Sequence, residues 1–181
     1  FLSDSNMNFT DSFFESMSGV TTTGSSVIQN ISDMSEGILI WRALLQWLGG
    51  VGIIVMALSI LPVLQVGGMQ VFRAESSDTT EKILPRTAQI SKAVIIIYLI
   101  LTFSCFLLYW IFGMNAFDSF AHSMTTIATG GFSNYDSSFA AFPAAVEYVA
   151  VVFMILAALP FVRYVQLLNG NQTAVFKDAQ V

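Results

Sequence analysis

The sequence predicts an all-α membrane protein, and three observations support this fold class. Of the 181 residues, 55% are hydrophobic and only 10% are charged. In soluble domains, roughly a quarter of the residues are charged. The apolar residues gather in three long stretches, residues 38–64, 93–115 and 146–168. One mixed motif of polar and apolar residues also occurs twice, which indicates an internal duplication.

Each of the three apolar stretches predicts a helix that crosses the membrane. Residues 38–64 contain a single charged side chain, Arg42, residues 93–115 contain none, and residues 146–168 contain two near their ends. At 1.5 Å per residue, each stretch is long enough to cross a hydrocarbon core of roughly 30 Å.

The positions of Lys and Arg predict how these helices are oriented. Residues 69–92 hold four basic residues, whereas residues 1–36 hold five acidic residues and no basic one. Cytoplasmic loops are enriched in Lys and Arg. We therefore expect the basic segment that connects the first two apolar stretches, and the tail at residues 169–181, to lie on the cytoplasmic side. Residues 1–36 and 115–142 are then expected on the outer side.

The duplication has an offset of 107 residues without gaps, which places Asp11 on Asp118 and Gly24 on Gly131. The shared motif reads D-S-F-x-x-S-M-[ST]-x-[VI]-x-T-x-G, which is too mixed to arise from low-complexity sequence. Internal duplication recurs in transport proteins. We therefore expect the two copies to form the same structure.

Each copy predicts a short helix, then a Thr/Gly segment, then a long apolar helix. The short helices cover residues 9–20 and 115–127, and Asp11 and Asp118 lie near their starts, where a carboxylate suits the positive end of the helix dipole. Helices of this length are too short to cross the membrane. A short helix that enters the membrane and returns as extended backbone is a re-entrant loop, and two such loops are predicted.

The returning segments predict a pathway for a monovalent cation. Non-helical backbone persists at membrane depth only where it is buried in protein or lines water, since unpaired N–H and C=O groups are costly in lipid. Carbonyl oxygens of a Thr/Gly segment replace the hydration shell of K⁺, and the short helices direct their negative ends toward the segments. Soft and nitrogen ligands for a transition metal are lacking. The predicted ion-binding residues are Thr21, Thr22, Thr23, Gly24 and Ser25, and Ala128, Thr129, Gly130, Gly131 and Phe132.

Three segments resemble the Trk/Ktr/HKT superfamily of potassium transporters, closest to the bacterial Trk-type pore subunit: FFESMSGVTTTGSS, LLQWLGGVGIIVMALSILPVLQVGGMQ and HSMTTIATGGFS. The resemblance covers essentially the whole chain. It implies a K⁺-channel-like architecture in which four repeats of outer helix, re-entrant pore helix, filter loop and inner helix surround one pore. Gly24 and Gly131 match the filter glycines that the family associates with K⁺ selectivity.

The resemblance also implies a division of the chain. Residues 1–68 match the pore helix, filter and inner helix of a first repeat, residues 69–89 a cytoplasmic connector, residues 90–168 a complete second repeat, and residues 169–181 a cytoplasmic tail. Two filter segments do not close a ring of carbonyls. We therefore expect a longer chain, with an outer helix on the N-terminal side and two further filter segments on the C-terminal side.

The function predicted in this way is potassium uptake through a pore in a prokaryotic inner membrane, with the filter loops facing outward, no enzymatic step and no cofactor. The family implies several partners: the remaining repeats of the same polypeptide, a second copy in a homodimer, a cytoplasmic nucleotide-binding regulatory subunit and the surrounding lipid, but no nucleic acid. Channel-like conduction and transport coupled to H⁺ or Na⁺ are both compatible with the sequence.

Two other classes of function were weighed. An intramembrane serine hydrolase would use Ser25 and His122, but it leaves Gly130, Gly131 and the threonines unexplained, whereas a duplicated filter motif accounts for both copies. A purely structural membrane subunit predicts that the complete protein carries no ion flux.

Other residues have structural interpretations. Gly49 and Gly52 lie inside an apolar helix and predict close helix packing rather than a nucleotide-binding loop. Arg42 is expected to reach the membrane surface or to pair with Asp33 or Glu36.

The aromatic and histidine side chains near the predicted outer surface are also expected to have structural roles. Trp41, Trp110 and Tyr109 are expected to act as anchors at the membrane interface. His122, whose counterpart in the first copy is Glu15, is expected to pack or to form hydrogen bonds, with proton sensing as a weaker alternative.

Overall fold

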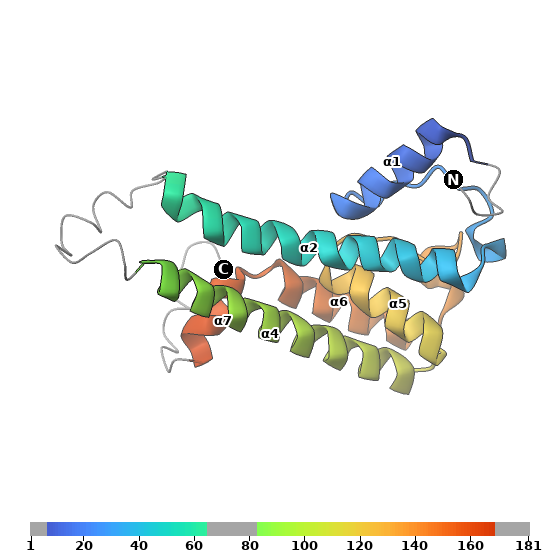
Figure 1. Cartoon of the computed structure of the whole chain (residues 1–181). Coiled ribbons are helices and arrows are strands. Elements are labelled where there is room, and N and C mark those ends of the chain that lie inside the picture. Colours follow the sequence, from blue (N-terminus) through green and yellow to red (C-terminus); the bar gives the residue numbers. More distant parts are fainter. Residues whose placement is uncertain (1–6, 65–82, 169–181) are drawn as a thin grey trace. The chain divides into compact units, whose positions relative to one another are not determined.

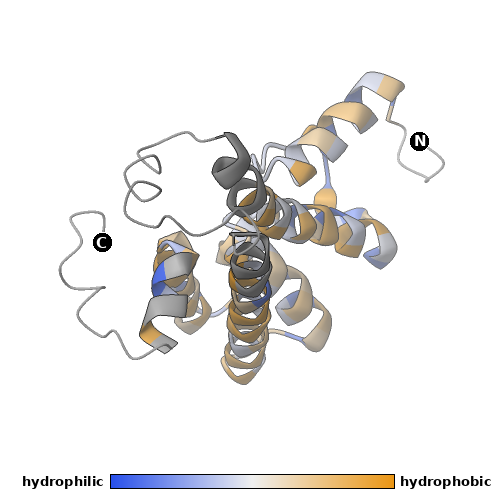
Figure 2. Ribbon diagram, turned by 60° about the vertical axis from the view of Figure 1, so that its left-hand side comes forward, coloured by the Kyte–Doolittle hydropathy of each residue, from blue (hydrophilic) through white to orange (hydrophobic). Residues whose placement is uncertain are grey.

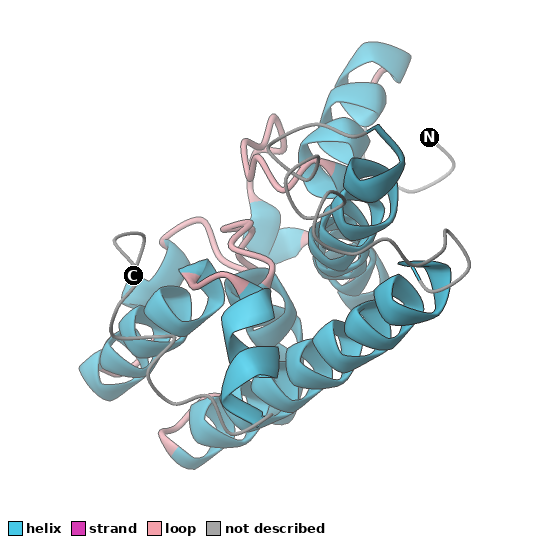
Figure 3. Ribbon diagram, turned by 90° about the vertical axis from the view of Figure 1, so that its left-hand side faces the viewer, coloured by secondary structure: helices cyan, strands magenta, loops and turns pink. Residues whose placement is uncertain are grey.

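The computed structural model describes residues 7–64 and 83–168 (Figure 1). The regular elements of these residues are all helices (Figure 3). In chain order they are α1 (Phe9–Val20), the 3₁₀ helix η1 (Ile31–Asp33), α2 (Glu36–Leu64), α4 (Ile83–Ile111), α5 (Ala116–Ile127), the 3₁₀ helix η3 (Ser138–Ala141), α6 (Ala144–Ala158) and α7 (Phe161–Leu168). The predicted all-α fold is confirmed.

The two short helices begin in the same way. The side-chain oxygen of Asn8 accepts a hydrogen bond from the Asp11 N–H (2.8 Å) at the start of α1. In α5, Asn115 accepts one from the Asp118 N–H (2.7 Å). Asparagine is a preferred residue at this position because its side chain satisfies an N–H that lacks a partner within the helix. The same start signal, an asparagine followed three residues later by an aspartate, therefore occurs twice in the sequence at the offset of 107 residues.

Within the part of the chain that the structure describes, two helices contain stretches that are long and apolar enough to cross a membrane, Glu36–Met56 of α2 and Ile90–Ile111 of α4. Their ribbons are coloured mainly as hydrophobic in Figure 2. α4 begins at Ile83, and its apolar stretch begins at Ile90, the residue at which the second repeat is predicted to start. Pro85 is compatible with this start because the first-turn N–H groups of a helix have no partner within it. Residues 69–82 of the connector lie outside the described residues.

The prediction of a single third spanning helix over residues 146–168 is wrong. α6 ends at Ala158 and α7 begins at Phe161. The break lies at Leu159, which is extended (φ −69°, ψ 142°), because a residue before proline is driven out of the helical conformation. Pro160 also has no N–H to continue the helix. With 15 residues, α6 is about 22 Å long, less than the roughly 30 Å of a hydrocarbon core.

The described residues divide into two compact units, one from residues 7–51 and 99–159 and the other from residues 52–64, 83–98 and 160–168. In the first unit, α5 and η3 both pack against α6. A small apolar core in this unit joins α2 to α5 through Ala43, Ala121 and Met124, and Ile40, Leu44 and Trp47 pack around it. In the second unit, the buried ring of Tyr98 lies 5.9 Å from the ring of Phe161.

α1 crosses α2 where both helices have small residues. A Cβ added to Gly19 would lie 3.0 Å from the Cβ of Leu45, and one added to Gly49 would overlap the carbonyl oxygen of Val20. The predicted close packing is therefore confirmed at Gly49. It is wrong at Gly52, where an added Cβ has no neighbour within 4 Å.

The three aromatic residues assigned to the membrane interface differ in burial. Trp41 and Trp110 are more than half exposed, as an interfacial position requires. Tyr109 is fully buried, and its hydroxyl lies 2.8 Å from the Thr126 hydroxyl oxygen. Its assignment as an anchor is wrong, because it joins α4 to α5.

Candidate functional site

The loops that follow α1 and α5 have matching backbone conformations. Thr22 and Thr129 have φ angles of 56° and 52°, and Gly24 and Gly131 have φ angles of 78° and 81°. A positive φ is unusual for threonine because its branched side chain crowds the backbone. Since the outlier occurs at both equivalent positions, the duplicated motif specifies it. The expectation of uniformly extended segments is wrong at these positions.

The N–H and carbonyl groups of the loops have different partners. The N–H groups of Thr22 and Thr23 donate to the last turn of α1 (both 3.0 Å), and those of Thr129 and Gly130 donate to the last turn of α5 (3.0 and 2.9 Å). Within the described residues, the carbonyl oxygens of residues 22–24 and 129–131 accept no hydrogen bond. No donor among the described residues would therefore compete with a cation for these oxygens.

The predicted ion-binding residues differ in exposure between the two loops. In the first loop, Thr21, Thr23 and Ser25 are exposed, while Thr22 and Gly24 are half-buried. In the second loop, Thr129 and Gly131 are exposed, while Ala128, Gly130 and Phe132 are buried. The buried Phe132 ring packs against a guanidinium group, so its side chain is part of the support behind the loop.

The two loops meet at their glycines. A Cβ added to Gly24 would overlap the carbonyl oxygen of Gly130. Only glycine combines the positive φ of 78° with this close approach. Gly24 is therefore required by contact between the two copies and by its own backbone conformation. By contrast, a Cβ added to Gly131 has no neighbour within 4 Å, and only its φ of 81° favours glycine.

Gln46 of α2 holds the second loop from behind. Its side chain is fully buried, and its Oε1 accepts a hydrogen bond from the Phe132 N–H (3.1 Å). A Cβ added to Gly130 would overlap the Gln46 amide, so a larger residue there would displace this side chain. Gln46 is not among the residues predicted from the sequence. A polar residue in the middle of an apolar span is the signal that identifies it, because such residues are costly in the membrane and usually functional.

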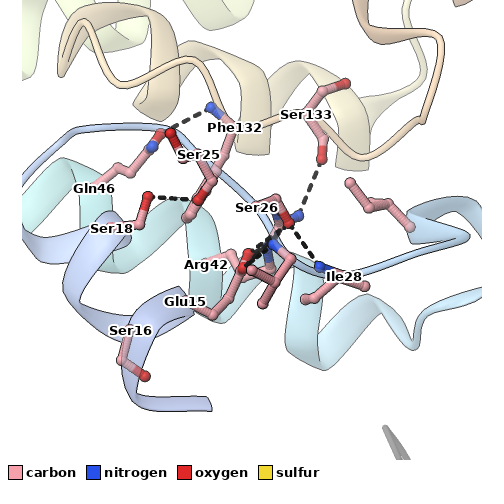
Figure 4. A network of polar contacts seen from close by, with 12 residues as sticks. Glu15, Ser16, Ser18, Ser25, Ser26, Ile28, Arg42, Gln46, Phe132 and Ser133 are labelled. Carbon is pink, nitrogen blue, oxygen red and sulfur yellow. Dashed lines mark hydrogen bonds and ion pairs between the residues drawn. The ribbon is translucent and has the colours of Figure 1, made fainter. Parts of the chain in front are cut away.

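Arg42 of α2 reaches the C-terminal ends of both loops (Figure 4). Its Nε donates to Glu15 Oε1 of α1 (2.9 Å), Nη2 donates to Ser26 Oγ (3.2 Å), and Nη1 donates to the Ser133 carbonyl oxygen (3.2 Å). The expected pairing of Arg42 with Asp33 or Glu36 is wrong. Arg42 is only 3% exposed, and a buried guanidinium requires a carboxylate and further acceptors at close range.

A second polar network supports the C-terminal end of the second loop. The Asp118 carboxylate accepts hydrogen bonds from Asn115 Nδ2 (2.8 Å), Asn134 Nδ2 (2.7 Å) and the Tyr135 hydroxyl (2.9 Å). His122 lies between the Asp118 carbonyl oxygen (2.9 Å from Nδ1) and Ser133 Oγ (3.0 Å from Nε2). The expected hydrogen-bonding role of His122 is confirmed.

Outside the membrane-spanning helices, Asp136 connects the two copies. Its carboxylate accepts hydrogen bonds from the Ile31 N–H (3.0 Å), the Ser32 hydroxyl (3.1 Å) and the Ser32 N–H (3.4 Å) at the start of η1. These donors, the Ile31 N–H first, lower the pKa of Asp136 below its ordinary value. The ionised form is therefore the one that stabilises the fold.

We expect Asp136→Ala to lower the apparent melting temperature of the purified protein at pH 7. A carboxyl with a lowered pKa contributes stability that is present above its ordinary pKa of about 3.9 and is lost as the pH falls through the lowered value. The difference from the wild type should therefore shrink below about pH 4. Asp33→Ala, which removes the same charge from η1, is the control. A difference that stays constant with pH would contradict this role for Asp136.

Comparisons with known proteins identify the family of the chain. A family model described as "TrkH: Cation transport protein" matches residues 1–177. The chain belongs to the TrkH family. The Trk system potassium uptake protein TrkI of Halomonas elongata is 45% identical over 177 residues, which are 97% of this chain and 36% of that protein. The Trk system potassium uptake protein TrkH of Escherichia coli K12 is 41% identical over 174 residues, 94% of this chain and 36% of that protein.

A solved TrkH-family structure has the same fold. The potassium transporter TrkH from Vibrio parahaemolyticus superposes with a TM-score of 0.81 at 40% sequence identity, over 97% of this chain and 35% of that chain. The chain thus spans about a third of the length of the TrkH-family relatives that it matches. As a member of a transporter family, it is an integral membrane protein and not an enzyme.

Proposed function

We propose that this chain forms part of a K⁺-selective pore for potassium uptake, and that the carbonyl oxygens of the two loops bind the ion. The observation that carries the proposal is the pair of left-handed threonines, Thr22 and Thr129, at equivalent positions. Backbone strain of this kind costs about 1–3 kcal/mol and concentrates at functional sites. The adjacent carbonyl oxygens have no donor among the described residues. The proposed ion-binding residues are Thr21, Thr22, Thr23, Gly24, Ser25, Ala128, Thr129, Gly130, Gly131 and Phe132.

The electrostatics of the short helices support the same assignment. α1 and α5 end at the loops, and neither has a basic residue in its last turn. The aligned peptide dipoles of a helix place a partial negative charge, roughly half an elementary charge, at its C-terminal end. Two such ends favour a cation at the loops and disfavour an anion.

The histidine contacts argue against the serine hydrolase. The hydroxyl next to His122 Nε2 belongs to Ser133, and the Nδ1 atom is bound to a backbone carbonyl and not to a carboxylate. The equivalent pair in the first copy is Glu15 and Ser26, which has no histidine. A duplicated structural contact explains both pairs, whereas a catalytic dyad explains one.

Ion flux through the full-length protein in liposomes tests the proposal. We expect saturable uptake of K⁺ and Rb⁺, with much weaker uptake of Na⁺ and Li⁺, because the carbonyl ligands must replace the hydration shell of the ion. Equal uptake of all four ions would contradict the proposed selectivity for K⁺. No flux of any ion would favour a purely structural subunit.

We further propose that the loops face outward from a prokaryotic inner membrane and that residues 69–82 are cytoplasmic. A cysteine at Ser77 should then react with an impermeant thiol reagent only from the cytoplasmic side. A cysteine at the exposed Ser137 should react only from outside. A single-cysteine background, obtained by replacing Cys105, removes labelling elsewhere. The reverse pattern would contradict the orientation.

The proposed partners follow from the number of ligands that a pore requires. A ring of carbonyls around one K⁺ needs several filter segments, and the described residues supply two. We propose that further repeats of the same polypeptide complete the ring, and that the complete protein is a homodimer with a cytoplasmic nucleotide-binding regulatory subunit. Single-particle mass measurement of the complex in detergent, with and without the regulatory subunit, tests both associations.

A further inference from the structure

In each copy, one side chain of the short helix contacts the serine that follows the loop, and we call this contact a brace. The helix side chain of the brace differs in charge between the two copies. In the first copy, Ser26 Oγ donates to Glu15 of α1 (2.9 Å). In the second, Ser133 Oγ lies 3.0 Å from His122 Nε2 of α5. The offset of 107 residues relates Glu15 to His122 and Ser26 to Ser133. The duplication therefore conserves the brace and changes an acidic side chain into a histidine.

Arg42 joins these two braces. Besides the ion pair with Glu15, it donates to Ser26 Oγ and to the Ser133 carbonyl oxygen. Its guanidinium carbon lies 4.1 Å from the centroid of the Phe132 ring, directly behind the second loop. Figure 4 shows the side chains of both copies converging on this group. The guanidinium thus lies next to both proposed filter loops and is covered from solvent.

A full positive charge at this position opposes the proposed function. The side chains of Arg42 and Glu15 are only 4% and 7% exposed, so water screens them weakly. An uncompensated guanidinium would repel a cation from the neighbouring carbonyls. Glu15 cancels that repulsion because its carboxylate is bound to Arg42 at 2.9 Å. The pair keeps the hydrogen bonds of the guanidinium while removing most of its field.

We propose that Glu15 and Arg42 are an affinity-determining pair for the transported cation: Arg42 positions the outer ends of both loops, and Glu15 is the counter-charge that allows K⁺ to bind beside it. This inference rests on the proposed function and adds to it two residues that line no part of the filter. A purely structural brace has a different signature. Loss of either partner would then change transport in the same direction.

The test measures the K⁺ concentration for half-maximal flux through the full-length protein in liposomes. Glu15→Gln should raise it on the order of tenfold, the effect of one unit charge over roughly 10 Å at an effective dielectric constant of about 20. Arg42→Gln should lower it, because the carboxylate then attracts the ion. The double variant Glu15→Gln/Arg42→Gln should raise it less than Glu15→Gln alone, because both charges are absent.

Two conservative variants separate charge from hydrogen bonding and should fold where a single neutral variant does not. Arg42→Lys and Glu15→Asp each keep the charge but weaken the hydrogen bonds, since lysine lacks the planar donor fork of arginine. Both should therefore shift the half-maximal K⁺ concentration less than Glu15→Gln does. Glu36→Gln removes the same charge from an exposed position at the start of α2 and should leave the value unchanged. Size-exclusion profiles in detergent confirm that each variant is folded.

Results that would overturn the inference are distinct from those that would overturn the function. If the wild type shows saturable K⁺ flux and Glu15→Gln and Arg42→Gln shift the half-maximal concentration in the same direction, the pair is only a brace. An unchanged value in Glu15→Gln would also overturn the inference, and so would a loss of affinity in Arg42→Lys equal to that in Glu15→Gln. Absence of K⁺ flux from the wild type would instead overturn the proposed function.

Discussion

Replacing Gly24 by alanine is expected to lower the preference of the full-length protein for K⁺ over Na⁺ by about tenfold or more, which corresponds to about 1.4 kcal/mol. The added Cβ would overlap the Gly130 carbonyl oxygen, so one of the two loops must move. Alanine at the φ of 78° adds strain of about 1–2 kcal/mol. Both effects displace carbonyl oxygens from the positions at which they replace the hydration shell.

Two glycine variants serve as comparisons for this result. Gly131→Ala meets only the backbone strain, since an added Cβ has no neighbour within 4 Å, and its effect on selectivity should be smaller but in the same direction. Gly52→Ala lies in α2 at a position with no close neighbour and should not alter selectivity. The permeability ratio is measured from reversal potentials or from competing fluxes. Unchanged ratios in both loop variants would contradict the assignment of the filter.

The largest loss of stability is expected from Asp118→Leu. Asp118 is 2% exposed and accepts hydrogen bonds from Asn115, Asn134 and Tyr135. Leucine accepts none of them, and each buried polar group left without a partner costs about 1–3 kcal/mol. We expect the free energy of unfolding to fall by about 3 kcal/mol or more, detected as a lower apparent melting temperature in detergent. Asp118→Asn keeps an acceptor oxygen and should be intermediate.

The internal duplication provides a matched control for Asp118. Asp11 occupies the equivalent position in α1 and is half-buried, and no hydrogen bond from a described residue reaches its carboxyl group. Asp11→Leu makes the same chemical change without leaving buried donors, so it should cost less than about 1 kcal/mol. Equal losses in the two variants would show that the helix dipole, and not the network around Asp118, is responsible.

Local sequence signals predicted the short elements well. The bounds of α1 agree with the prediction, and α5 begins one residue later than predicted because Asn115 is its cap. The fold class and the family also follow from the sequence. Such features depend on neighbours within a few residues, through apolar periodicity, capping and dipole effects. Pro160 is also a local signal, and its effect on the third apolar helix was underestimated.

The partners of buried polar groups depended on the tertiary structure. Arg42 was expected near Asp33 or Glu36, which are close in sequence, yet its carboxylate is Glu15, 27 residues away and on another helix. Gln46 contacts Phe132 across 86 residues.

By itself, the sequence determined that the chain is helical and membrane-embedded, that its motif is duplicated, and which residues form the two Thr/Gly loops. Only the tertiary structure showed that the two loops touch each other and that Gly24 therefore tolerates no side chain. It also showed that the ion pair of Arg42 and Glu15 lies next to the loops. The physical reason is range. Helices and turns form from contacts a few residues apart, whereas a buried charge selects its partner from whatever the packed helices bring within hydrogen-bonding distance.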